Sequence, residues 1–223
     1  SHYIEEEDNF SLRYPDPILG KPWSFPLEFP LYEWAVVFLS RAGGQPHTEA
    51  ARTVSLACFY LMLPAVYWLL GNAGLAPARR LLAVSLILTC PVYIFYSRAF
   101  LIESMVLMFS AWFLALFVRT MRERRWYWLA GCAVAGSASA LVKSTTFLVW
   151  LLPAALYGAW RLWGDLRGRA SWRRVAGTLG WGLGSVVLPG SLLFWWVTYT
   201  DRIKAAHASA HIFTSKSLTE GNY

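Results

Sequence analysis

Long apolar stretches with almost no charge are the feature that most restricts how this chain can fold. Six of them occur, at about residues 52–70, 81–97, 101–118, 126–142, 145–162 and 175–198. Each approaches or exceeds the roughly 17 to 25 residues that an α-helix needs to cross a bilayer. Because backbone groups in hydrocarbon must be hydrogen-bonded within the segment, we expect all six to be helices. The sequence therefore predicts an all-α, polytopic transmembrane helical bundle over residues 45–199.

The low charge content also indicates a membrane environment. Hydrophobic residues make up 57% of the chain and charged residues 15%, against roughly 25% charged in an ordinary globular domain. The formal net charge is +7, but the basic residues lie in short runs between apolar stretches and form no continuous face, so we expect no nucleic-acid partner. Cys58, Cys90 and Cys132 lie inside apolar stretches without metal-ligand spacing, so we expect neither a disulfide nor a zinc site.

The segments outside the spans are a loop, an interfacial helix and a tail. Residues 1–28 are polar, rich in Pro and contain the acidic run Glu5 to Asp8, so we expect a loop. In residues 29–44, a proline suited to a first helical turn precedes apolar side chains at helical spacing. About thirteen residues are too short to span, so we expect an amphipathic helix in the membrane interface. Residues 200–223 form the tail.

Arginines in the turns between spans indicate the orientation. They cluster in alternate turns, at residues 79–80, 119–125 and 161–174. The other two turns contain Arg98 and Lys143. By the positive-inside rule the arginine-rich turns are cytoplasmic, which places the acidic loop, Arg98, Lys143 and the tail on the non-cytoplasmic side.

Ionisable residues converge at this non-cytoplasmic side, where charges at a bilayer boundary are costly and often functional. Glu103 falls about one turn into an apolar helix and needs a partner. Arg98 or Lys143 could neutralise it as a structural pair, or the group could bind a ligand. The two cations could equally extend from helix ends to the headgroups. The run Glu5 to Asp8 is either a solvated stretch or part of a site.

Two stretches resemble a known family. They are Pro26-Leu27-Glu28-Phe29-Pro30-Leu31-Tyr32 and Pro91-Val92-Tyr93-Ile94-Phe95-Tyr96-Ser97-Arg98-Ala99-Phe100-Leu101-Ile102-Glu103. Between them, Glu49-Ala50-Ala51-Arg52-Thr53-Val54-Ser55 resembles the start of the helix that follows the interfacial segment. From about residue 7 to 200, the chain resembles the polyprenyl-phosphate-sugar-dependent glycosyltransferases of the protein mannosyltransferase and aminoarabinose transferase type. These enzymes form glycosyltransferase family 39 and have the GT-C fold.

The resemblance implies an inverting sugar transfer from a polyprenyl-phosphate donor to a lipid or glycan acceptor. A carboxylate on the first non-cytoplasmic loop would take the proton from the acceptor hydroxyl, which attacks the anomeric carbon. In this sequence the base would come from the acidic run, with Asp8 and Glu7 as the preferred candidates.

The same resemblance assigns roles around the donor. Glu28 and Glu103 match acidic residues that line the donor pocket, where they could hold a divalent metal ion or orient the sugar. Arg98 and Lys143 stand where a cation could offset charge on the departing phosphate. Tyr32 belongs to an aromatic-rich interfacial segment that suits an amphipathic donor, although anchoring in the membrane explains these rings equally well.

The resemblance also implies a location and a longer parent protein. We expect an integral protein of the bacterial inner (plasma) membrane, in contact with membrane lipid and with its active site facing the periplasm or exterior. Family members normally have a helix before the acidic loop and further helices after the last span, so we expect this chain to be a fragment that is inactive alone. The alternative functions are a multi-pass transporter, for which internal repeats and broken helices would be typical, and an inactive membrane fragment.

Overall fold

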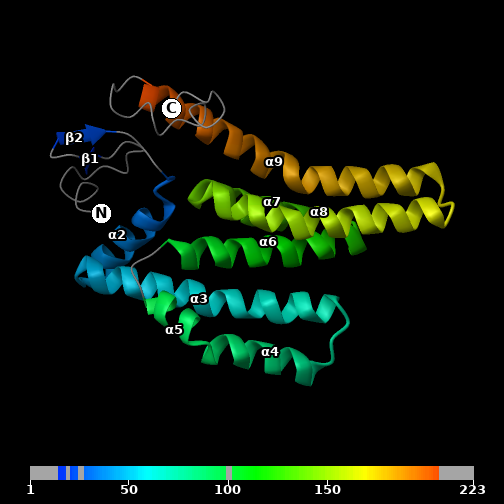
Figure 1. Ribbon diagram of the computed structural model, residues 1–223, viewed down its shortest axis with the longest axis horizontal. Helices are drawn as coiled ribbons and strands as arrows, with labels where there is room; N and C mark the ends of the chain where they lie inside the picture. The colour runs from blue at the N-terminus through cyan, green and yellow to red at the C-terminus, as the bar shows by residue number, and fades with distance from the viewer. Residues whose placement is uncertain (1–14, 19–20, 25–27, 99–101, 206–223) are drawn as a thin grey trace, which may run out of the picture.

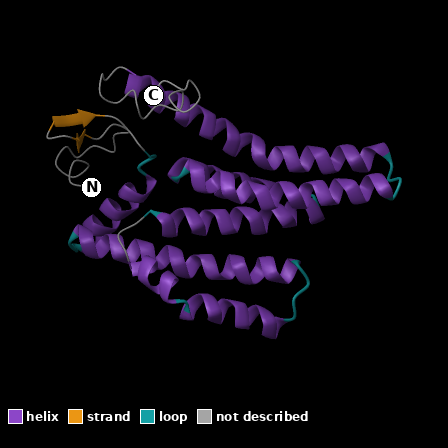
Figure 2. Ribbon diagram, viewed as in Figure 1, coloured by secondary structure: helices purple, strands orange, loops and turns teal. Residues whose placement is uncertain are grey.

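The computed structural model describes residues 15–18, 21–24, 28–98 and 102–205, and helices dominate this part of the chain (Figures 1 and 2). The helices are α2 (Leu31–Gly43), α3 (His47–Asn72), α4 (Pro77–Thr89), α5 (Pro91–Arg98), α6 (Glu103–Glu123), α7 (Trp126–Val142), α8 (Ser144–Arg167) and α9 (Trp172–Ala205). A short antiparallel hairpin, β1 (Pro15–Ile18) and β2 (Lys21–Ser24), lies in the segment expected to be a loop. The prediction of an all-α membrane bundle is confirmed, with this hairpin as a local addition.

The long helices run alternately up and down the bundle (Figure 1). The connections from α3 to α4, from α6 to α7 and from α8 to α9 lie together at one end, and α2 and the hairpin lie at the other. The first end carries the arginine-rich turns, so we call it the arginine end, and we call the opposite end the hairpin end. The predicted alternation of the arginine-rich turns is therefore present in the described helices.

Helix α6 lies at the centre of the bundle and packs against α3, α7, α8 and α9. The contact with α7 is close, because a Cβ atom placed on Gly136 would lie 2.8 Å from Phe113 Cδ2 of α6 and 2.8 Å from Pro189 Cγ of α9. Ser110 and Ser139 also form a buried hydrogen bond of 2.6 Å between α6 and α7. In a membrane the hydrophobic effect does not drive helices together, because lipid tails are as apolar as the side chains. Helices there associate through close packing at small residues and through hydrogen bonds between hydroxyl groups.

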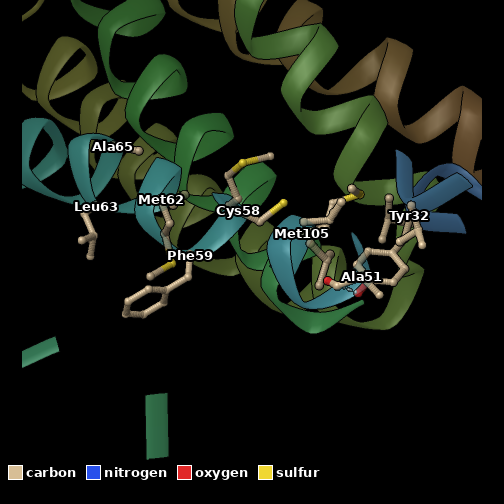
Figure 3. Packing of buried hydrophobic residues seen from close by; sticks show 14 of the residues in the cluster. Tyr32, Ala51, Cys58, Phe59, Met62, Leu63, Ala65 and Met105 are labelled. Atoms are coloured by element: carbon tan, nitrogen blue, oxygen red, sulfur yellow. Dashed lines mark hydrogen bonds between the residues drawn. The ribbon is translucent and has the colours of Figure 1, made fainter. Parts of the chain in front are cut away.

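Helix α2 is fixed to the bundle through α3 (Figure 3). The Tyr32 side chain is buried, its hydroxyl donates to the Ala51 carbonyl oxygen at 3.0 Å, and it shares a 2.8 Å hydrogen bond with Ser55 Oγ. Cys58, Met62 and Met105 continue the same hydrophobic cluster from α3 to α6. This packing holds the segment before α2 at the hairpin end.

Three described helices are long and apolar enough to cross a membrane, namely α3, α6 and α9 over Trp172–Ile203. Helix α7 is apolar but shorter, and α8 has 24 residues and carries charged side chains in its last two turns. Large apolar side chains such as Leu86, Leu152 and Phe194 are exposed on the outer helices, as expected for surfaces that face lipid. The number of spans beyond these three stays a prediction.

The expected span at residues 81–97 is not one continuous helix. Helix α4 ends at Thr89, Cys90 is extended with φ −69° and ψ 118°, and α5 begins at Pro91. Proline has no backbone N–H, so at the first position of a helix it leaves no N–H group without a partner. Its ring disfavours the helical conformation for the residue before it, which here is Cys90. The Thr89 hydroxyl donates to the Ser85 carbonyl oxygen at 2.9 Å, next to this break.

Candidate active site

Glu103 and Lys143 meet at the hairpin end of the bundle. Glu103 is the first residue of α6, and Lys143 lies between α7 and α8, where its backbone is extended with φ −155° and ψ 99°. The Lys143 Nζ donates to Glu103 Oε1 at 2.6 Å. The backbone of Lys143 is fixed by both flanking helices, because its N–H donates to the Ser139 carbonyl and its carbonyl accepts from Phe147. Of the two partners proposed for Glu103, the structure pairs it with Lys143.

The second carboxylate oxygen of Glu103 lies in a different situation. Glu103 Oε2 is shielded from solvent, and it has no hydrogen-bond partner among the described residues. A buried polar atom of this kind normally has a partner, and leaving it without one costs free energy. The Glu103 carboxylate therefore has one oxygen bonded to Lys143 and a second oxygen that is unpaired among the described residues.

Glu28 belongs to the same group of charges. The Phe29 N–H donates to the Leu141 carbonyl at 3.4 Å, which ties the chain beside Glu28 to the end of α7, two residues before Lys143. Partial burial raises the pKa of the Glu28 carboxyl, the Lys143 ammonium lowers it, and the negative charges of Glu33 and Glu103 raise it. Glu28 therefore lies close enough to Lys143 and Glu103 for their charges to influence its carboxyl.

Aromatic rings form a wall next to these charges. The Phe29 ring makes edge-to-face contacts with Trp34 at 5.2 Å and with Trp196 of α9 at 5.1 Å between centroids. Trp196 also stacks on Tyr199, with centroids 5.6 Å apart. No residue of α9 was predicted from the sequence to belong to the site. The run of aromatic residues near the end of the last span was the available signal, but it is also typical of a membrane-interface belt.

The other predicted site residues are placed differently. Tyr32 lies in the interface between α2 and α3, with its hydroxyl bonded to α3, so it positions the segment that carries Glu28. Arg98 is the last residue of α5, near the hairpin end, but its side chain lies outside the described part of the structure. Glu7 and Asp8 also lie outside the described residues. Their assignment as the catalytic base stays a prediction.

The divalent-metal role predicted for Glu28 and Glu103 stays a prediction. Divalent cations of the Mg²⁺ type are bound through several oxygen ligands, often from more than one carboxylate. The described residues contain no group of three or more His, Cys, Asp or Glu side chains that could hold a metal ion. The Lys143 ammonium, 2.6 Å from Glu103 Oε1, already neutralises the carboxylate that a metal would need. Within the described residues, Glu28 and Glu103 are the two carboxylates that could contribute oxygen ligands at this end.

Comparison with known proteins identifies the family. No curated protein and no solved structure matches the chain. A family model described as dolichyl-phosphate-mannose-protein mannosyltransferase matches residues 3–201, which confirms the resemblance seen in the sequence. This match and the apolar helices make the protein an integral membrane glycosyltransferase that uses a polyprenyl-phosphate-linked sugar donor. The chain therefore belongs to the dolichyl-phosphate-mannose-protein mannosyltransferase family.

Proposed function

We propose that the hairpin end of the bundle binds the sugar and phosphate of a polyprenyl-phosphate-linked donor. From there the sugar is transferred, with inversion at the anomeric carbon, to a hydroxyl of a lipid, glycan or protein acceptor. The observation that supports this most strongly is Glu103 Oε2, a shielded carboxylate oxygen without a partner among the described residues. Sugar hydroxyls are hydrogen-bond donors of the kind that such an oxygen accepts. The neighbouring Glu28 adds a second carboxylate, and Phe29 and Trp196 add apolar ring surface.

The proposed reaction needs a base and a stabilised leaving group. Asp8 or Glu7 takes the proton from the acceptor hydroxyl, and the oxygen attacks the anomeric carbon. The new glycosidic bond forms while the bond from the anomeric carbon to the phosphate oxygen breaks, and polyprenyl phosphate leaves. Lys143, held in place by Glu103, offsets the negative charge that develops on the phosphate, and Arg98 contributes a second positive charge. A fixed cation of this kind does not need to reorganise during the reaction.

The proposed orientation follows from the arginines. Turns at the arginine end contain most of the basic residues of the bundle, so that end faces the cytoplasm, and the hairpin end faces the periplasm or exterior of a bacterial plasma membrane. Donor, acceptor and the charged group would then meet on the non-cytoplasmic side. The aromatic wall lies at the depth at which an amphipathic donor passes from hydrocarbon to headgroups.

A transporter is less well supported. Transporters bind substrates near the middle of the membrane between broken helices. Three ion pairs of the described helices lie near the helix ends instead, namely Lys143–Glu103, Arg119–Glu123 and Arg124–Asp165. The break at Cys90 separates α4 and α5, and no opposing broken helix occurs among the described spans.

The test compares the two ends of one helix. The protein is reconstituted into liposomes with a radiolabelled polyprenyl-phosphate-linked mannose, and transfer to extracted lipid, glycan and protein acceptors is measured. Glu103→Gln, at the start of α6, should reduce the initial rate at least about 100-fold, because it removes the charge that holds Lys143. Glu123→Gln, at the other end of α6, is the matched control and should leave the rate within about twofold. Equal rates for the two variants would reject the proposed site.

A further inference from the structure

The arginine end contains a cleft that the proposed reaction does not use. Its volume is about 570 Å³, and it lies between α8, the end of α6 and the start of α9. The residues that line it include four arginines and one carboxylate, namely Arg122, Arg124, Arg161, Arg174 and Asp165. The cleft therefore carries a net positive charge and suits an anion.

One of these arginines is held rigidly. Arg124 ends α6 in the left-handed region, with φ 54°, and its Nη2 donates to Thr178 Oγ1 at 2.7 Å. Thr178 in turn donates to Asp165 Oδ2 at 2.6 Å. A Cβ atom on Gly177 would lie 2.9 Å from Arg124 Nη1, so the glycine leaves room for the guanidinium. Asp165 is thus occupied in positioning Arg124.

The other arginines keep most of their donors available. The Arg161 Nη2 makes a long hydrogen bond of 3.5 Å to the Met121 carbonyl, and the Arg122 Nη1 donates to the Asn72 carbonyl at 3.0 Å. Within the described residues, the Arg174 side chain makes no hydrogen bond or ion pair. Each guanidinium has five N–H donors in a geometry that matches phosphate.

An apolar groove begins next to the cleft. It has a volume of about 330 Å³ and lies between α6, α8 and α9. Met121 and Thr178 line it, and these two residues also contact Arg161 and Arg124 of the cleft. Gly158 and Gly182 provide its width. From Thr178 to Val186 the groove follows α9 for roughly 12 Å, close to half of the roughly 30 Å hydrocarbon core.

Exposed tryptophans indicate where this end lies relative to the membrane. Trp160 and Trp163 line the cleft, and both are largely exposed, as are Trp126 and Trp172, the first residues of α7 and α9. Exposed tryptophan rings concentrate at the level of the lipid headgroups. The cleft therefore lies at headgroup depth, and the groove extends from it into the hydrocarbon.

We propose that the cleft and the groove together bind one anionic phospholipid from the leaflet at the arginine end. The phosphate lies between Arg161, Arg174 and the fixed Arg124, and one acyl chain lies in the groove beside Gly158. A soluble phosphate would use the cleft alone, whereas the continuous apolar groove requires an amphipathic ligand. Basic pockets between transmembrane helices on this side of a membrane are suited to acidic lipid headgroups.

The test measures lipid retention by native mass spectrometry of the full protein in detergent. With phosphatidylglycerol as the probe, one lipid should bind more tightly than phosphatidylcholine does. The double variant Arg161→Gln, Arg174→Gln should weaken phosphatidylglycerol binding about 25-fold, or about fivefold for each arginine, and leave phosphatidylcholine unchanged. Arg173→Gln, next to Arg174 but not lining the cleft, is the matched control and should bind as the parent protein does.

A second pair of variants tests the groove without changing charge. Gly158→Leu fills the groove and should also weaken phosphatidylglycerol binding, whereas Gly180→Leu, with no atom within 4 Å of its added Cβ, should not. Unchanged binding in Gly158→Leu or in the arginine double variant, with each shown to be folded by its thermal unfolding, would overturn the proposal. Inorganic phosphate binding as tightly as phosphatidylglycerol, or polyprenyl phosphate binding more tightly, would also overturn it. Because lipid retention does not depend on sugar transfer, the result is independent of the proposed function.

Discussion

Reversing the Glu103–Lys143 ion pair would separate a structural role of these residues from a role in the reaction. The perturbation is the double variant Glu103→Lys, Lys143→Glu, compared with each single variant. The two side chains are 39% and 29% exposed, with 2.6 Å between Oε1 and Nζ. The reversed pair can form a similar contact, but it places the carboxylate where the ammonium was.

The expected magnitudes differ for stability and for activity. Two charges about 4 Å apart in an effective dielectric of about 20 attract by about 4 kcal/mol, and desolvation and side-chain ordering offset most of this. Partly exposed pairs accordingly contribute about 0.2 to 1 kcal/mol. Each single variant should therefore lower the unfolding temperature by at most about 2 to 4 °C, and the reversed pair should recover most of that loss. Removing a fixed charge from a developing phosphate anion costs about 2.7 to 4 kcal/mol of transition-state stabilisation, or about 100- to 1,000-fold in rate.

The assay measures thermal unfolding and the initial rate of sugar transfer for the four proteins. We expect the reversed pair to be nearly as stable as the parent protein and still at least about 100-fold slower. Recovery of both stability and transfer in the reversed pair would refute the reasoning, because it would make Glu103 and Lys143 a structural pair only.

Three further predictions concern the surroundings of the site. Burial raises the pKa of Glu28 and Lys143 lowers it, so the loss of donor binding that follows protonation of Glu28 should occur at a higher pH than for an ordinary glutamate. Lys143→Met should move this loss to still higher pH, and an identical pH profile of the donor KM in the two proteins would contradict this. Gly136→Leu should destabilise the bundle by about 1 to 3 kcal/mol, because its Cβ would meet Phe113 and Pro189. Its unfolding temperature is compared with that of Gly180→Leu, which should equal the parent's. Tyr32→Phe should cost about 1 kcal/mol in the same unfolding measurement, because a buried hydrogen bond to Ala51 is lost. The KM for the donor should stay unchanged, whereas a raised KM without loss of stability would place Tyr32 in contact with the donor.

The arrangement of the long helices could be predicted from the sequence, because each apolar segment has to satisfy its own backbone hydrogen bonds in lipid. An apolar stretch must form a helix wherever its neighbours lie, and the arginines in alternate turns set its direction. The breaks were harder to predict. Pro64, Pro153 and Pro189 lie inside continuous helices, whereas Pro91 begins a new one after an extended Cys90. The residue type is the same in all four cases, and packing by neighbouring helices decides whether the helix continues.

The candidate site was predictable in its charges but not in its contacts. The sequence predicts that a carboxylate next to an apolar stretch has a cationic partner. Glu103 is the first residue of α6 instead of lying one turn inside a helix, and its contact with Lys143 depends on how α6 and α7 are rotated. The contact of Phe29 with Trp196 joins segments near the two ends of the described chain, and no local pattern indicates it. The arginine cleft was not predicted for a similar reason. The positive-inside rule already accounts for its arginines, and the sequence does not show that they line one cleft.

The joint at Cys90 separates the direction of α5 from the direction of α4. A continuous span can only tilt as a whole, and tilting any of the long helices would disturb the contacts of α6 with its neighbours. Helix α5 has eight residues, about two turns, and is connected to α4 through an extended residue. The direction of α5, and with it the position of the Arg98 backbone, is therefore set separately from the direction of α4. A change at this one residue would turn two helical turns and leave the contacts of α6 with α3, α7, α8 and α9 as they are.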